Sequence, residues 1–427
     1  MNVRRSTAVL AAATAVIGAA SAPASVAAGP SPSPVLPSEL YGSTDPTYDG
    51  VWRQSLALLA QHTVGVKPAA KAVDWLTGQQ CADGAFAPYR ADTAKACDAK
   101  LMVDTNNTAA AVQALAALGG HHAATGKAVA WLKSVQNTDG GWGYTPGGAS
   151  DTNSTSVVIG ALTAVGEKAQ DVRKGDRTPY DALVKLALRC DGDGAGAFAF
   201  QPDKKNSLAA NADATAAGVV GALGKGLAAT AGKQGAASKQ GQAGKQGQLG
   251  EPGAVAGCGE GRSPQQAAAN GVAYLTKALA KDGHLKSALP GATDLPDYGN
   301  TADAVVALAA QGGAGRAAGP LTWLEKNSAA WAKQSGPAAY AQLIFAAHAT
   351  GTDPRDFGGT DLVTQLNATG PAPLAATAES TDGSDSDSAS ASDSGGSGNV
   401  WWMVAAGLAA GAGIGFLLSG RNKRRRP

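Results

Sequence analysis

Four short polar stretches of the sequence share one spacing, in which an aspartate or asparagine is followed four residues later by a threonine. The pairs are Asp104 with Thr108, Asp151 with Thr155, Asn211 with Thr215 and Asp297 with Thr301. Side-chain oxygens of this kind accept hydrogen bonds from the free backbone amides at a helix start. If they gather in one place, the same oxygens can hold the amides and hydroxyls of a ligand. The spacing therefore predicts helix caps, a ligand site, or both.

The predicted ligand-binding set consists of these pairs and the asparagines among them. Its members are Asp104, Asn106, Thr108, Asp151, Asn153, Thr155, Asn211, Thr215, Asp297, Asn300 and Thr301. We predict no catalytic residue and no metal ligand, because the five histidines (His62, His121, His122, His284 and His348) lack the spacing of a metal site. Glutamates are few and scattered between residues 29 and 370, so a glycosidase would have to rely on aspartates.

The polar stretches belong to a repeated unit of helix, glycine turn and capped helix. In the clearest copy, an apolar helix pattern ends at the glycine turn 139–142 and the next helix begins at 151–153. We predict the first helices of five pairs at 69–79, 128–135, 180–188, 267–280 and from 321, the fifth pair ending at 349 with a split near Gly336. Residues 51–61 and 361–367 are left over and make a sixth pair from the two chain ends.

Six such pairs predict an all-α fold, an α/α toroid of about six helix pairs with an inner barrel of six helices inside an outer barrel of six. Alanine, the best helix former, dominates every copy, and no segment alternates as a strand does. Parallel inner helices would gather the polar helix starts at one mouth. The toroid is expected over 50–368, after a linker at 29–49. Residues 225–262, rich in Gly, Gln and Lys, predict a disordered insertion.

Both chain ends predict export and anchoring. Residues 1–28 have the basic start, apolar run and small-residue end of a signal peptide. Residues 369–399 predict a flexible Ser/Asp/Gly stalk, 400–419 a transmembrane helix, and 420–427 a basic cytoplasmic tail. We therefore expect a single-pass membrane protein with its N-terminal domain outside the cell. The alternative is sortase attachment at 374–378, which resembles an LAxTG site except at Ala378.

The charge balance indicates which partners to expect, and the cysteine content indicates the role of the cysteines. Basic and acidic residues balance between 29 and 370, so no nucleic-acid partner is expected. Four cysteines in an exported chain favour two disulfides over metal ligands or nucleophiles. Three pairings are possible, and proximity in the sequence favours Cys81 with Cys97 and Cys190 with Cys258.

The glycine turns carry a resemblance to a known family. Residues 136–143 (QNTDGGWG), residues 79–86 (QQCADGAF) and the DTNxT helix starts resemble the repeat of squalene cyclases and protein prenyltransferases, in the α/α-toroid superfamily. The resemblance covers about 50–368 and implies the toroid. Because one fold hosts many functions, it does not by itself imply an activity.

The enzymes of this superfamily use motifs that the chain lacks. Cyclases protonate an alkene with a DxDD run, for which the nearest stretch here is 191–194, and they line their cavity with aromatic residues, which make up only 5% of this chain. Prenyltransferases hold zinc with Asp, Cys and His. Residues 257–261 resemble the GCGEQ thioester motif of complement-type proteins, but Gly261 replaces the required glutamine. These departures favour a non-catalytic protein.

The corrinoid carriers are the closest binding proteins in this superfamily, being secreted, disulfide-stapled toroids with a VDT-type helix start like Val103-Asp104-Thr105. This resemblance implies a surface-anchored binding protein whose ligand is a corrinoid or another polar cofactor. The carriers close over their ligand with a β-rich domain, so a separate β-domain protein or a membrane transporter is the expected partner. A terpenoid cyclase or prenyltransferase-like enzyme and an envelope scaffold remain the alternatives.

Overall fold

The computed structural model describes residues 36–232, 257–259, 262–288 and 293–375, all of which fall in one compact unit. The predicted signal peptide, transmembrane helix and basic tail, with most of the stalk and the insertion, lie outside these residues. Within the described ranges, every helix is too short or too polar to cross a bilayer.

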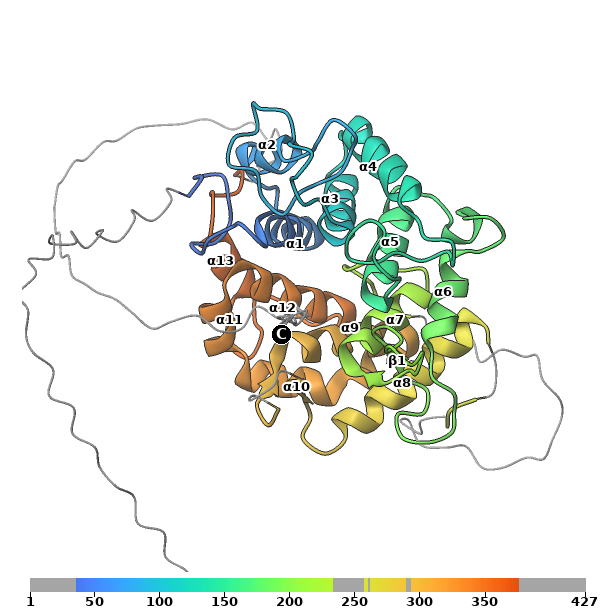
Figure 1. Ribbon diagram of the computed structural model, residues 1–427. Coiled ribbons are helices and arrows are strands. Elements are labelled where there is room, and N and C mark those ends of the chain that lie inside the picture. Colours follow the sequence, from blue (N-terminus) through green and yellow to red (C-terminus); the bar gives the residue numbers. More distant parts are fainter. Residues whose placement is uncertain (1–35, 233–256, 260–261, 289–292, 376–427) are drawn as a thin grey trace, which may run out of the picture. The chain divides into compact units, whose positions relative to one another are not determined.

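Six helices form a closed inner ring, labelled in Figure 1. They are α1 (Gly50–Thr63), α3 (Thr105–Leu118), α5 (Thr152–Ala164), α7 (Ala212–Ala222), α9 (Tyr298–Gly312) and α12 (Pro337–Thr350). Each packs on the next in this order, and α12 packs back on α1. Their buried residues, mostly Ala, Val and Leu, surround each helix instead of forming one stripe, as expected for helices with neighbours on all sides.

A second layer of helices covers the ring. It consists of α2 (Ala70–Gly78), α4 (His122–Ser134), α6 (Pro179–Leu186), α8 (Pro264–Leu279), α10 (Ala318–Asn327), α11 (Ala329–Ser335) and α13 (Leu362–Asn367). Outer helices bury one face only; α2, for example, buries Ala72 and Leu76. The predicted α/α toroid is confirmed, with one addition: the fifth outer element is broken in two at Ser328.

The two chain ends meet as the sixth pair, as the sequence predicted. Gln61 on α1 donates from Nε2 to Oδ1 of Asn367 on α13, at 2.7 Å. The buried Tyr41 hydroxyl donates to Gln61 Oε1 and to the carbonyl of Pro371, each at 3.1 Å. Leu374 N donates to the carbonyl of Lys67 at 2.9 Å. Three of these bonds join segments more than 300 residues apart, and they tie the two ends of the toroid together.

Short non-helical elements connect the layers. Two antiparallel pairs, β1 (Phe198–Ala199) with β2 (Ala210–Asn211) and β3 (Leu285–Lys286) with β4 (Pro296–Asp297), precede α7 and α9. The 3-10 turns η1 (Ala169–Asp171) and η2 (Ala314–Ala317) follow α5 and α9. Two residues are too few to show the alternation by which a strand is recognised, so these pairs could not be predicted from the sequence.

The glycine turn after α4 requires its glycines. Gly140 has a φ of +90°, and a Cβ there would lie 2.2 Å from the carbonyl oxygen of Thr178. The turn delivers Trp142 to the core, where it is fully buried and its Nε1 donates to the carbonyl of Leu132 at 2.7 Å. Neighbouring repeats therefore pack closely where the backbone of Gly140 meets that of Thr178, and no residue larger than glycine fits there.

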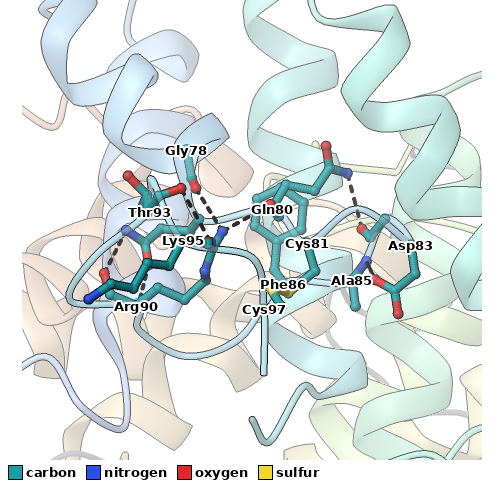
Figure 2. The surroundings of a disulfide bond; sticks show 12 residues. Gly78, Gln80, Cys81, Asp83, Ala85, Phe86, Arg90, Thr93, Lys95 and Cys97 are labelled. Carbon is teal, nitrogen blue, oxygen red and sulfur yellow. Dashed lines mark hydrogen bonds between the residues drawn. A yellow bond between two sulfur atoms is a disulfide. The ribbon is translucent and has the colours of Figure 1, made fainter. Parts of the chain in front are cut away.

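Both predicted disulfides, Cys81–Cys97 and Cys190–Cys258, are present. Figure 2 shows the first beside Arg90, whose buried guanidinium donates to the carbonyls of Gly78, Gln80, Thr93 and Lys95. Carbonyls at a helix C-terminus carry partial negative charge, which stabilises a cation there. Arg90 and the disulfide thus fix the same long loop after α2.

Candidate functional site

Every predicted cap residue caps an inner helix. The side chain accepts the backbone N–H three residues further on, with distances between 2.6 and 3.0 Å. In the three aspartates the second carboxylate oxygen accepts from the side chain of that same residue, which is Asn107, Ser154 or Asn300. Both carboxylate oxygens of Asp104, Asp151 and Asp297 are therefore engaged within the fold.

The four paired threonines are fully buried and connect the two helical layers. Their hydroxyl oxygens accept the backbone N–H of Phe86, Trp142, Phe198 and Leu285 at 2.9 to 3.1 Å. Each of these donors follows the turn after an outer helix. The repeated four-residue spacing thus serves the fold: its first residue starts the inner helix, and its second holds the preceding turn against that helix.

A different repeated position faces the axis of the inner ring. This position comes two residues after the cap and two residues before the threonine. Its side chain and that of the threonine therefore point about 200° apart around the helix. The threonine faces the outer turn. The position on the opposite side of the helix from the threonine is occupied, on successive inner helices, by Asn106, Asn153, Asp213 and Gly299. The first three are partly exposed, as expected for side chains lining an opening.

We call the end of the inner ring that carries Asn106, Asn153, Asp213 and Gly299 the mouth. Asn153 and Asp213 bridge neighbouring inner helices there. Asn153 Nδ2 on α5 donates to Asp213 Oδ2 on α7 at 2.7 Å. Within the described residues, Oδ1 of Asn153 and Oδ1 of Asn106 are buried without a hydrogen-bond partner. Buried acceptors are normally satisfied, so these two amide oxygens indicate a place for a donor from outside the chain.

A second bridge lies one helical turn deeper on the same face. Gln342 Nε2 on α12 donates to Asp303 Oδ2 on α9 at 3.2 Å. Burial raises the pKa of Asp303 to about 7, and the nearby charges of Asp213 and Asp297 add to the rise. Burial also raises the pKa of Asp213, while the bond from Asn153 opposes that rise. Near neutral pH, Asp303 can therefore serve as either donor or acceptor.

The pKa values of two capping aspartates beside the mouth, Asp104 and Asp151, are also raised. Burial raises the pKa of Asp104 and of Asp151 to about 6, while hydrogen bonds from Asn107 and Ser154 oppose the rise. The Tyr144 hydroxyl also hydrogen-bonds to Asp104, and burial together with that carboxylate raises the pKa of Tyr144.

The far end of the ring is closed by residues 225–232. Leu227 N donates to Gln113 Oε1 on α3 at 2.8 Å, and Gly232 N donates to the carbonyl of Ala309 on α9 at 3.0 Å. Because α3 and α9 are not neighbours in the ring, the segment crosses its interior. These residues were predicted to begin the disordered insertion, and that prediction was wrong for them: Gly226 allows backbone to approach Gln113 closely, which residue composition does not reveal.

The mouth is separate from the grooves found on the outer layer. One groove of about 570 Å³ lies along the turn after α4 and includes Asn137, Asp139 and Lys185. It contains none of the predicted ligand-binding residues. Among the described residues, no three His, Cys, Asp or Glu side chains are placed to hold a metal ion.

Sequence reasoning singled out the caps and overlooked several residues at the mouth. Of the predicted set, Asn106 and Asn153 retain an unpartnered oxygen, whereas Asn300 donates to its own cap. Asp213, Asp303, Gln342 and Tyr144 were missed. A signal was present for Asp303: it lies four residues after Gly299, on the same helix face.

The two layers of paired helices define an α/α toroid. Residues 51–217 match the family model described as the prenyltransferase alpha-alpha toroid domain. This stretch therefore has the repeats of that domain, and the rest of the ring continues the same architecture without a match to that family model. No curated protein sequence matches the chain.

Three solved structures are similar to this chain at low sequence identity and with TM-scores below 0.5. An ent-copalyl diphosphate synthase from Streptomyces platensis is 16% identical, with a TM-score of 0.45, covering 71% of this chain and 50% of that enzyme. A type II terpene cyclase from Scytonema is 13% identical, with a TM-score of 0.36 and coverages of 65% and 68%. A sugar epimerase from a ruminal bacterium is 14% identical, with a TM-score of 0.37 and coverages of 62% and 73%. The chain spans about half the length of the Streptomyces platensis enzyme.

Proposed function

We propose that this protein binds a small polar ligand, rich in N–H or O–H donors, at the mouth formed by the N-terminal ends of its inner helices, and that it does not transform that ligand. The observation that supports this is the pair of buried, unpartnered amide oxygens of Asn106 and Asn153. Leaving such acceptors unpaired costs about 1–3 kcal/mol each, which a ligand's donors would recover on binding.

A corrinoid is the first ligand to test. Its rim of amide side chains offers N–H groups to an acceptor-lined mouth. The described residues contain only two-residue strands and no second domain to close over a ligand. The proposal therefore includes a separate partner, either a β-domain protein or a membrane transporter, that covers the other face of the ligand.

Calorimetric titration of the purified full-length chain with cobalamin tests this proposal. We expect saturable binding that weakens in Asn106→Ala, which removes an unpartnered oxygen without breaking any bond described in the fold. Asn327→Ala, on the exposed side of α10, is the matched control and should bind as the wild type does. Absence of binding to cobalamin and its biosynthetic relatives would exclude the corrinoid; equal binding by both variants would place the site elsewhere.

We also propose that the toroid is exported and displayed on a single C-terminal membrane anchor. The two disulfides support this, because such bonds persist in oxidising compartments. External protease added to intact cells should digest the toroid. Deleting residues 400–427 should move the protein from the membrane fraction to the medium; a truncated chain that stays with the membrane would contradict the anchor.

One observation favours a second candidate function, that of a cyclase-like enzyme. Asp303 faces the interior of the ring and its raised pKa keeps part of its population protonated at neutral pH. A protonated carboxyl is the acid that an alkene-protonating cyclase needs. Incubation with polyprenyl substrates, followed by mass spectrometry of the products, separates the two functions: a cyclised product that disappears in Asp303→Asn would establish catalysis and refute passive binding.

A further inference from the structure

The groove on the outer layer, beside the turn after α4, takes no part in the binding proposed at the mouth. It has a volume of about 570 Å³ and lies between residues 136–139 of the turn, residues 147–150 of the loop before α5, and α6. Thr138 and Ala149 line it and are exposed, so the groove opens at the surface. A side chain of another protein can therefore enter it.

Three side-chain oxygens of the turn can accept hydrogen bonds in this groove. Gln136 is only 4% exposed and donates from Nε2 to the carbonyl of Gly140. Asn137 uses its Nδ2 for two bonds to the loop, and Asp139 accepts two bonds through Oδ1 alone. Within the part of the chain that the structure describes, no hydrogen bond reaches Gln136 Oε1, Asn137 Oδ1 or Asp139 Oδ2. The groove is therefore rich in acceptors.

The turn after α2, in the first repeat, is built in the same way. Gln80 donates from Nε2 to the carbonyl four residues further on at 3.0 Å, and Gln136 does the same at 2.8 Å. The next residue ties each turn to the loop that follows, Cys81 through its disulfide and Asn137 through its amide. Gln136 is therefore equivalent to Gln80, and Asn137 to Cys81.

An arginine of the chain itself fills the space between turn and loop in the first repeat. The Arg90 guanidinium donates to the carbonyl of Gln80, in the turn, and to that of Lys95, in the loop (Figure 2). The loop of the second repeat, residues 144–150, carries no charged residue. No hydrogen bond from the described residues reaches the carbonyl of Gln136, the equivalent of Gln80. The second repeat thus leaves open a place that the first fills with a guanidinium.

The chemistry of the groove matches a guanidinium from outside the chain. This group presents five N–H donors in one plane and keeps its positive charge at any physiological pH. Among the residues that line the groove, Asp139 and Lys185 carry the charges. Lys185 is exposed on α6, and its flexible stem lets the ammonium turn towards water. Asp139 then supplies the counter-charge.

We propose that this groove binds the arginine side chain of a partner protein, with Asp139, Asn137 and Gln136 accepting hydrogen bonds from the guanidinium. The inserted side chain takes the role that Arg90 has in the first repeat. This site is independent of the ligand proposed at the mouth.

Ligand-observed NMR titration of the full-length protein with Nα-acetyl-arginine methylamide, which resembles an arginine within a chain, tests the inference. The corresponding citrulline compound has the same shape without the charge and should bind about tenfold more weakly or less. Free arginine should bind no better than the capped form. Tighter binding of free arginine would overturn the assignment to a partner's side chain.

Variants on the two walls of the groove should act in opposite directions. Asp139→Asn keeps the Oδ1 that holds the turn and should weaken binding about tenfold, since a hydrogen bond to a charged group is lost. Lys185→Met removes a like charge and should strengthen binding about threefold. Asp83→Asn is the matched control, because Asp83 has the same place in the first turn, and it should bind as the wild type does.

Thermal unfolding of each variant separates binding from folding, and Lys185→Met tests the groove without touching the turn. Equal binding of the citrulline compound, unchanged binding in Asp139→Asn, or weaker binding in Lys185→Met would overturn the inference.

Discussion

The threonine of each repeat offers the sharpest test of how the layers are joined. Thr108 is fully buried, accepts the Phe86 N–H at 2.9 Å and donates to the carbonyl of Asp104 at 2.8 Å. Thr108→Val keeps the shape and removes both bonds. The Asp104 carbonyl retains the backbone N–H of residue 108, but the Phe86 N–H is left buried without an acceptor.

The expected cost follows from that unpaired donor. Leaving a buried N–H unsatisfied costs about 1–3 kcal/mol, so we expect the free energy of unfolding to fall by about 2 kcal/mol. Thr108→Ser keeps the hydroxyl and loses one methyl group, for about 1 kcal/mol. Urea denaturation with the disulfides intact, followed by circular dichroism, measures both variants.

Thr77→Val is the matched control, because the Thr77 hydroxyl only donates to carbonyls of its own helix. Its stability should stay within about 0.5 kcal/mol of the wild type. If Thr108→Val is as stable as this control, or if the serine variant is the less stable of the two at position 108, the buried bond to Phe86 does not hold the layers together.

Three further predictions concern turns, pH and disulfides. Gly140→Ala should destabilise the fold far more than Gly147→Ala in urea denaturation, because both have positive φ but only Gly140 meets a backbone oxygen. The pKa of Asp151 is raised on folding, so the folded state binds a proton more readily and stability should fall as pH rises from about 4 to 6; this slope should be smaller in Asp151→Asn. Removing Cys190–Cys258, which closes the longer loop, should cost roughly 1 kcal/mol more than removing Cys81–Cys97, as measured by denaturing the two double-serine variants.

The Asp–Thr pairs show how one sequence pattern supports two interpretations, a helix cap and a ligand contact. In the sequence, a row of Asp and Thr at fixed spacing suits a cap and a ligand contact equally well. The structure shows both Asp104 oxygens bonded within the chain and the Thr108 hydroxyl bonded to the preceding turn. The residues proposed to bind a ligand at the mouth therefore lie two positions after each cap, as Asn106 does after Asp104, because capping does not use their side chains.

The sequence by itself determined the architecture of this protein. Glycine turns, helix caps and apolar spacing are local signals, since each depends on backbone geometry within a few residues, and they recur often enough to count six pairs. Proximity along the chain also selected the right disulfides. Even the pairing of the two chain ends followed from the same count, because each was half of a repeat.

Only the tertiary structure decided which side chains meet at the mouth. Asp213 and Asp303 stand 90 residues apart in the sequence, on the inner helices α7 and α9, which pack against each other in the fold. Burial raises the pKa of both carboxyl groups, and the charge of Asp297 adds to both rises, which no local pattern encodes. The crossing of residues 225–232 beneath α3 and α9 is likewise a contact between distant segments. Local chemistry determines each repeat, whereas the site is formed by packing between neighbouring inner helices that lie far apart in the sequence.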